Sequence, residues 1–352
     1  GSYCGRIGAD TFAMLRPVCA LPDQQQAQNL MREKLKGAPV KNVGLKFGMY
    51  HIEDRTMPAS GMYDRAQLAL SMIKHKYNQC FNVYDDRIHK RMLWEHQLYD
   101  AMEQGLNEKQ FVMYLQPKHD VNSSRIVGAE ALVRWIHPTL GFISPGDFIP
   151  LFERNGFITR LDRYMWEAVC QLLHRWIEEG RPLIPISVNA SRADFDQDDL
   201  PQVISDLTDE YEIPHETFHL EVTESAYTDN PQQIINSVSE LRALGFKIEM
   251  DDFGTGYSSL NMLSDLPIDI LKLDMRFMQR GKNELDDHRD SILSFIISLS
   301  KWLQLPTVAE GVESRNEVDL LKSMGCNFIQ GYFFAKLMPV AEFEDYMSRC
   351  AT

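Results

Sequence analysis

The C-terminal part of this chain contains a series of short apolar segments, each about as long as a β-strand. Several are continuous apolar runs, as expected for strands that are covered on both faces. The segments are Phe111–Gln116, Ile126–Val133, Leu183–Val188, Phe218–Val222, Phe246–Met250, Ile268–Leu273, Pro306–Ala309 and Asn327–Gln330. Strands in this number, with helices between them over about 240 residues, predict an α/β protein with a closed, TIM-like (β/α)8 barrel.

The segments between these strands carry start and stop signals of helices. Thr159 and Asp162 have the spacing of a capping box, and Ser314 with Glu317 repeats it. The predicted helix ends are three glycines, Gly180, Gly245 and Gly325. An open doubly wound sheet is the alternative fold. It would require a glycine-rich phosphate loop after its first strand, and the sequence has none.

Polar side chains stand at or next to the ends of most of these strands. They are Glu130, Asn189, Glu221, Asp251, Asp252, Lys272, Glu310, Glu313 and Gln330. Because the carboxyl ends of barrel strands meet on one face, we expect these groups to converge. Carboxylate and amide oxygens are the ligands that hard divalent cations such as Mg²⁺ or Mn²⁺ prefer. The pattern therefore predicts a barrel with a catalytic metal site.

Each of these residues, taken alone, also has a structural explanation. Asn189 could cap the helix that follows it, and Asp251 with Asp252 could belong to a turn. Lys272 could pair with Asp274. The catalytic interpretation depends on their joint occurrence at the ends of successive strands.

Composition limits the classes of partner. The 352 residues carry a formal net charge of −14, and the sequence pI is about 5.2. This charge argues against a nucleic-acid polymer, whose binding depends on neutralising phosphates. A small anionic ligand is compatible with it if bound cations reverse the sign locally.

Two further features bear on location. No apolar run reaches membrane-spanning length and no signal-peptide pattern is present, so we expect no membrane segment. The six cysteines are scattered without CxxC spacing. We therefore expect reduced thiols and a cytoplasmic location, which also suits the output end of a larger protein, even a membrane-anchored one.

The N-terminal part differs in pattern from the rest. Residues 1–86 predict strand, turn, strand, helix, strand, helix and strand, which is a small α/β layer too short to be a whole domain. Residues 87–106 predict a single polar helix that links two domains, and residues 107–352 form the predicted barrel.

The C-terminal motifs together resemble the EAL domain, the bacterial phosphodiesterase that hydrolyses cyclic di-GMP to linear pGpG. The family motif itself is Glu130-Ala131-Leu132, followed by Arg134 and Trp135. The other matching motifs, in order, are QP at Gln116-Pro117, SVNAS, EVTES, DDFGTGYSSL, KLD, AEGVE and QGYFF. Their number and order make chance agreement implausible.

The resemblance implies a role for each polar residue. It gives one divalent ion, Mg²⁺ or Mn²⁺, to Glu130, Asn189, Glu221 and Asp251, and a second ion to Asp251 and Asp252. Lys272 would orient or deprotonate the attacking water, and Glu310 would lie near the water ligands of the second ion. The implied substrate-binding residues are Gln116, Leu132, Arg134 and Gln330, and the implied supporting residues are Glu224 and Glu313.

The N-terminal part resembles the second half of a GGDEF domain, the diguanylate cyclase fold. The signature hairpin reads GADTF at residues 8–12, so alanine replaces the second glycine and Thr11 replaces the glutamate. Threonine cannot replace a carboxylate that handles metal and phosphate. We therefore expect no cyclase activity from this degenerate sequence.

Two alternatives to a phosphodiesterase stay open at this point. One is a cyclic di-GMP receptor without turnover, and the other is a scaffold that serves only protein contacts. The resemblance also implies a homodimer formed through the EAL domain. We expect the loop of residues 253–259, supported by Glu224, to couple that assembly to catalysis.

Overall fold

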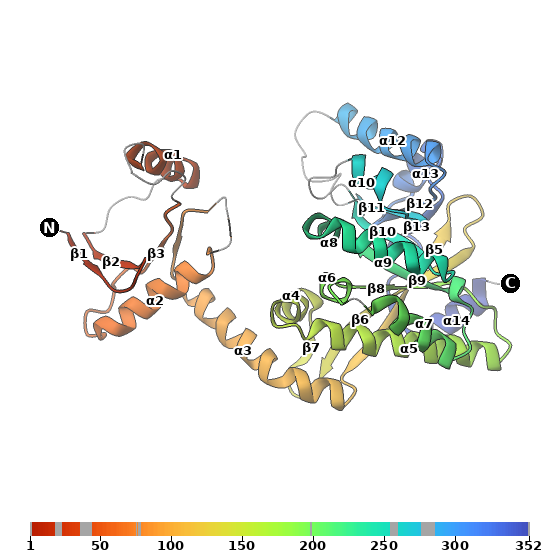
Figure 1. Cartoon of the computed structure of the whole chain (residues 1–352), viewed down its shortest axis with the longest axis horizontal. Helices are drawn as coiled ribbons and strands as arrows, with labels where there is room; N and C mark the ends of the chain where they lie inside the picture. Colours follow the sequence, from red (N-terminus) through yellow and green to blue (C-terminus); the bar gives the residue numbers. More distant parts are fainter. Residues whose placement is uncertain are drawn as a thin grey trace. The chain divides into compact units, whose positions relative to one another are not determined.

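The structure is a computed structural model that describes residues 2–17, 23–35, 44–74, 76, 79–197, 199–253, 260–275 and 286–350 (Figure 1). The chain divides into two compact units, Gly1–Asp100 and Ala101–Thr352. The division falls inside helix α3 (Asp86–Asn107), which is one continuous helix where the linker helix was predicted. In the part of the chain that the structure describes, no helix is both long and apolar enough to cross a membrane.

The N-terminal unit has the predicted order of elements. Strand β1 (Tyr3–Arg6) pairs antiparallel with β2 (Phe12–Leu15). The first four residues of GADTF lie in the turn between them, and Phe12 begins β2. The later elements are α1 (Gln24–Leu35), β3 (Phe47–Met49), α2 (Ala59–Ser71) and β4 (Phe81–Val83). Strands β3 and β4 form a separate parallel pair. The domain boundaries predicted from the sequence stay predictions.

The C-terminal unit is built on a closed barrel of eight strands, which confirms the predicted fold class. Around the barrel the strands are β5 (Phe111–Asp120), β6 (Ile126–His137), β8 (Ile186–Asn189), β9 (Phe218–Thr223), β10 (Lys247–Phe253), β11 (Ile270–Asp274), β12 (Thr307–Glu310) and β13 (Phe328–Gln330). Closure comes from β5, which pairs with both β6 and β13. Two short strands, β7 (Gly141–Ile143) and β14 (Met338–Pro339), pair with β6 and β5.

Strand β5 departs from the regular pattern of a (β/α)8 barrel, because it runs antiparallel to both of its barrel neighbours. The expected alternation of strand and helix is therefore wrong at the first strand. Residues 121–125 are too few for a helical crossover and instead make a turn, in which Asp120 accepts the backbone NH groups of Asn122 and Ser123. The register places Gln116 opposite Glu130.

Helices lie around the barrel strands (Figure 1). They are α4 (Pro145–Asn155), α5 (Ile158–Glu178), α6 (Arg192–Phe195), α7 (Leu200–Glu210), α8 (Glu224–Asp229), α9 (Pro231–Ala243), α10 (Leu260–Asp265), α12 (Asp286–Trp302), α13 (Arg315–Met324) and α14 (Val340–Cys350), with a 3₁₀ turn η1 (His215–Thr217) before β9. Helices α4, α7 and α9 contain a proline in their first turn, and α5 carries a buried apolar stripe that includes Leu161, Val169 and Trp176.

The predicted helix ends are confirmed, and one of the two predicted capping boxes is wrong. Gly180, Gly245 and Gly325 all take positive φ angles where helices end. The capping box of Ser314 and Glu317 is present at the start of α13. At α5, by contrast, the helix begins at Ile158, and the Thr159 hydroxyl donates to the carbonyl of Gly156. Since Gly156 ends α4 with a φ of 80°, α5 begins almost at once and leaves Thr159 inside it.

Successive side chains of the barrel strands point alternately to two buried faces, and this alternation positions the residues of the site. On β9, Phe218, Leu220 and Val222 are fully buried, and they alternate with His219 and Glu221. Neighbouring side chains on a strand point to opposite faces, so one set packs under the helices and the other enters the barrel. Strands β10 and β11 repeat the pattern with Glu249, Asp251 and Lys272 on the polar set. The interior of this barrel is therefore charged.

Candidate active site

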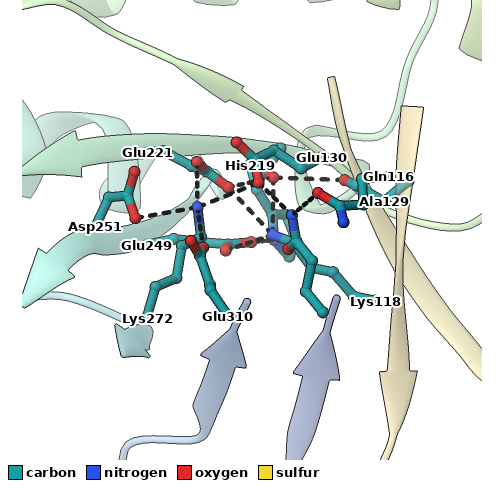
Figure 2. A network of polar contacts seen from close by, with 12 residues as sticks. Gln116, Lys118, Ala129, Glu130, His219, Glu221, Glu249, Asp251, Lys272 and Glu310 are labelled. Atoms are coloured by element: carbon teal, nitrogen blue, oxygen red, sulfur yellow. Dashed lines mark hydrogen bonds and ion pairs between the residues drawn. The ribbon is translucent and has the colours of Figure 1, made fainter. Parts of the chain in front are cut away.

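Four carboxylates from four different strands surround one buried ammonium group (Figure 2). The Lys272 Nζ atom lies 2.5 Å from Glu221 Oε2, 2.7 Å from Glu310 Oε1, 3.2 Å from Asp251 Oδ1 and 3.5 Å from Glu130 Oε2. We call these five residues the Lys272 cluster. The structure thus brings together the predicted Glu130, Glu221, Asp251, Lys272 and Glu310, which lie far apart in the sequence.

The Lys272 cluster carries more negative than positive charge, with four carboxylates against one ammonium. Burial and the adjacent Glu130 carboxylate raise the pKa of Glu221 to about 8. Burial, together with the carboxylates of Asp251 and Glu130, also raises the pKa of Glu310 well above its ordinary value. Burial opposes a charge on Lys272, but the surrounding carboxylates outweigh it and raise the pKa of the lysine. The cluster therefore favours any further cation that can reach it.

Two oxygen atoms at this cluster are buried without a hydrogen bond. One is Oε1 of Gln330, whose amide nitrogen donates to Gln116 Oε1 at 3.2 Å and to Glu130. The other is Oε1 of Glu310, which meets Lys272 as an ion pair but lacks hydrogen-bond geometry. Buried acceptors without donors are costly unless a cation or a water molecule satisfies them. The donor set and these oxygens fit a divalent metal and its water ligands.

Gln330 is held in place by the residue that follows it. A Cβ atom on Gly331 would lie 2.2 Å from the carbonyl oxygen of Val312, so only glycine fits there. The backbone of β13 can consequently approach Val312 closely, and the Val312 NH donates to the carbonyl of Gln330. The close approach fixes the end of β13 beside the cluster.

The predicted substrate residues Leu132 and Arg134 lie on β6 at spacings of two and four residues from Glu130, so they share its face of the strand. Arg134 is half-buried, its guanidinium donates to the Val133 carbonyl at 2.7 Å, and it lies 5.9 Å from the ring centre of Tyr114. The structure thus places a cation on the same strand and the same face as Glu130.

For the remaining predicted site residues the structure gives the position and the exposure of the side chain but few contacts. Asn189 ends β8 directly beside Glu221 in the register, with an exposed side chain. Glu224 is buried as the first residue of α8. Glu313 is exposed, and its backbone NH donates to Glu317, so among the described contacts its side chain does not join the cluster.

The side chain of Asp252 and the loop residues 254–259 lie outside the described part of the structure. Among the side chains that are described, no three acidic, histidine or cysteine groups share a common point for a metal ion. The carboxylates instead surround the Lys272 ammonium, which supplies the positive charge in this structure.

A second buried lysine, which the sequence reasoning missed, lies deeper in the barrel (Figure 2). Lys118 Nζ contacts Ser187 Oγ at 2.8 Å and Glu249 Oε2 at 2.6 Å, and His219 Nδ1 lies 2.8 Å from Glu249 Oε1. We call these four residues the Lys118 cluster. A charged residue inside an apolar strand, two positions after Gln116, was the signal that could have identified Lys118.

Comparison with known proteins identifies the class to which this site belongs. The family model described as "EAL domain" matches residues 99–337, and the chain therefore belongs to the EAL-domain family. The match covers every described residue of the Lys272 cluster.

Individual relatives agree with this assignment. The cyclic di-GMP phosphodiesterase RocR of Pseudomonas aeruginosa is 33% identical over 247 residues, which are 69% of this chain and 62% of RocR. An uncharacterized signaling protein of Caulobacter vibrioides is 30% identical over 352 residues, covering 96% of this chain and 42% of that protein. A solved structure, the PaMucR phosphodiesterase in complex with c-di-GMP, superposes with a TM-score of 0.66 at 34% identity, over 70% of this chain and 99% of that one. The chain spans less than two thirds of the length of these curated relatives.

Proposed function

We propose that this chain is a metal-dependent phosphodiesterase that hydrolyses cyclic di-GMP to linear pGpG. The observation that carries the proposal is the Lys272 cluster, an excess of carboxylates at the strand ends of an EAL barrel. Its relatives include a protein named as a cyclic di-GMP phosphodiesterase and a phosphodiesterase solved with c-di-GMP.

The charges of the reactants explain why such a cluster suits this reaction. A phosphodiester is anionic and repels nucleophiles, and four carboxylates alone would repel it further. Two divalent ions, Mg²⁺ or Mn²⁺, would reverse the sign of the site, polarise the phosphate and provide a water of lowered pKa. Glu130, Asn189, Glu221 and Asp251 would hold the first ion, and Asp251 with Asp252 the second.

The chain's own residues would then orient the reactants. Lys272, in contact with Asp251 and Glu310, would orient the attacking water, or would take its proton once bound metal ions had replaced the ammonium as the positive charge of the site and the lysine had lost its own proton. Gln330 and Gln116, which are hydrogen-bonded to each other, would position the phosphate and its water. Arg134 would contact the non-bridging phosphate oxygens, and Leu132 on the same face would line the substrate.

Cyclase activity is not part of this proposal, because the N-terminal unit lacks the necessary carboxylate. In the turn between β1 and β2, Thr11 stands where a glutamate would be needed, and its hydroxyl donates to Asp10 at 3.1 Å. Incubation with GTP should therefore yield no cyclic di-GMP. The degenerate GGDEF assignment, the homodimer, the coupling role of residues 253–259 and a cytoplasmic location likewise stay predictions.

The main rival is a receptor that binds cyclic di-GMP without turnover, and a scaffold is the third possibility. Titrating the purified chain with cyclic di-GMP in Mg²⁺, while separating the nucleotides by chromatography, distinguishes all three. We expect pGpG to accumulate with wild type and not with Asp251→Asn. Saturable binding without product would instead indicate a receptor, and neither binding nor product would indicate a scaffold.

A further inference from the structure

The Lys118 cluster is connected to the Lys272 cluster through one residue, Glu221. Lys118 Nζ lies 3.2 Å from Glu221 Oε1, and the Ser187 hydroxyl donates to the same oxygen at 2.5 Å. The other carboxylate oxygen, Oε2, accepts from Lys272 at 2.5 Å. Figure 2 shows the Glu221 carboxylate between the two ammonium groups. Both oxygens of this proposed metal ligand are therefore fixed from opposite sides.

Because these groups are buried, the loss of any one of these contacts should be strongly unfavourable. The side chain of Glu221 has no exposed surface and that of Lys118 is 7% exposed. In a buried site water does not replace a lost partner, and an unpaired charge there is strongly unfavourable. A change at Lys118 must consequently be compensated by movement of the remaining groups.

The direction of that movement follows from the contacts. With Lys118 removed, Glu221 would retain its 2.5 Å contact to Lys272 on one side and only the Ser187 hydroxyl on the other. The attraction to Lys272 would then be unopposed by a second cation. The carboxylate would then turn about its contact with Lys272 and leave the orientation in which we expect it to bind a metal.

Glu249 stabilises the positive charge on Lys118. The two oxygens of Glu249 are divided between Lys118 Nζ at 2.6 Å and His219 Nδ1 at 2.8 Å. Glu249 makes no hydrogen bond or ion pair with the Lys272 cluster among the described contacts, so its contacts reach the site through Lys118. Ser187, Lys118, Glu249 and His219 come from four different strands.

We infer that Lys118 is a positioning residue for the metal site, which holds the Glu221 carboxylate in its metal-binding orientation against the attraction of Lys272. This inference rests on the proposed function, since it assigns Glu221 to a metal ion. Groups that orient a metal ligand from behind typically change metal affinity about 10- to 100-fold when they are removed.

The test compares two variants of the full chain that both disturb the deeper cluster. Lys118→Met keeps most of the length of the side chain but removes the contact to Glu221. His219→Gln is the matched control, because His219 contacts Glu249 and not Glu221. We expect both to lower the melting temperature. Calorimetric titration with Mn²⁺ alone should show at least about tenfold weaker binding for Lys118→Met and nearly unchanged binding for His219→Gln.

A second variant covers the case in which Lys118→Met does not fold. Ser187→Ala removes the 2.5 Å hydrogen bond to Glu221 with little change in volume, and it should also weaken Mn²⁺ binding. Equal Mn²⁺ affinity in wild type and in the variants at Lys118 and Ser187 would overturn the inference alone. Equal weakening by His219→Gln would also overturn it, since the effect would then be only structural. Wild type that binds no Mn²⁺ would contradict the proposed function as well.

Discussion

The interior of the barrel contains two buried lysines with opposite surroundings. Lys272 faces four carboxylates, and oxygens of Glu310 and Gln330 beside it lack hydrogen bonds. Lys118 faces Glu249 and shares Glu221, and each described oxygen around it has a partner. Burial and charge are common to both clusters. The Lys272 cluster therefore differs from the Lys118 cluster in its excess of negative charge and in its acceptors without hydrogen bonds.

This difference has a thermodynamic consequence. Like charges that are held together by the fold oppose folding unless a cation neutralises them, whereas a balanced and fully hydrogen-bonded pair does not. The Lys272 cluster should thus cost stability in the metal-free protein, and the Lys118 cluster should contribute to it. The following variants test that contrast.

The largest expected effect is a loss of turnover when Lys272 is replaced. Lys272→Ala should lower the rate of pGpG formation by about 10²–10⁴-fold, the usual range for a group that handles a proton in the transition state. Lys322→Ala, at an exposed position of α13, is the matched control and should keep the wild-type rate. A Lys272→Ala variant with near-normal turnover would remove the lysine from the mechanism.

The next prediction compares how the loss of one carboxylate from each cluster changes the stability of the protein. In metal-free protein, Glu249→Gln breaks a balanced buried pair and should cost about 3 kcal/mol, or roughly 6–12 °C in Tm. Glu310→Gln instead removes a carboxyl group whose ionisation the crowded, buried cluster opposes, and it should leave Tm unchanged or raise it. Thermal unfolding in excess chelator measures both. If Glu310→Gln were the more destabilising of the two, the contrast between the clusters would be wrong.

The smallest effect concerns His119, the neighbour of Lys118 on the opposite face of β5. Its ring stacks on Phe334 at 4.4 Å between centroids, and burial lowers its pKa to about 4. An ordinary histidine titrates near pH 6.5, so below that pH the unfolded chain binds a proton that the folded chain does not. Stability should therefore be complete above about pH 6.5 and decline as the pH falls toward 4.

This contribution amounts to about 1 kcal/mol between pH 7 and pH 5.5. His119→Phe keeps the stacking and removes the titrating group, so its stability should fall less steeply over that range. Chemical denaturation at the two pH values gives the slopes. An unchanged slope in the variant would show that His119 does not contribute.

Local patterns in the sequence were sufficient to predict the strands and the Lys272 cluster. The apolar segments with polar ends correspond to β5, β6 and β8–β13, because side-chain alternation and strand-end chemistry are visible within a few residues. The capping box at Ser314 was predictable for the same reason.

The features that the sequence did not reveal depend on distant contacts. The partners of Lys118 are Ser187, Glu221 and Glu249, which are 69, 103 and 131 residues away along the chain. The antiparallel direction of β5 is decided by the short turn after Asp120 and by pairing with β13 at the other end of the domain. The false capping box at Thr159 arose because a helix ending at Gly156 leaves no room for a separate start.

We propose above that the charge excess at Lys272 makes a divalent-metal site for phosphodiester hydrolysis. The most direct measurement is pGpG formation from cyclic di-GMP by the full chain in Mg²⁺, in Mn²⁺, in Ca²⁺ and in excess chelator. We expect turnover with Mg²⁺ or Mn²⁺, inhibition by the larger Ca²⁺, and no product in chelator. Undiminished turnover in excess chelator would contradict it.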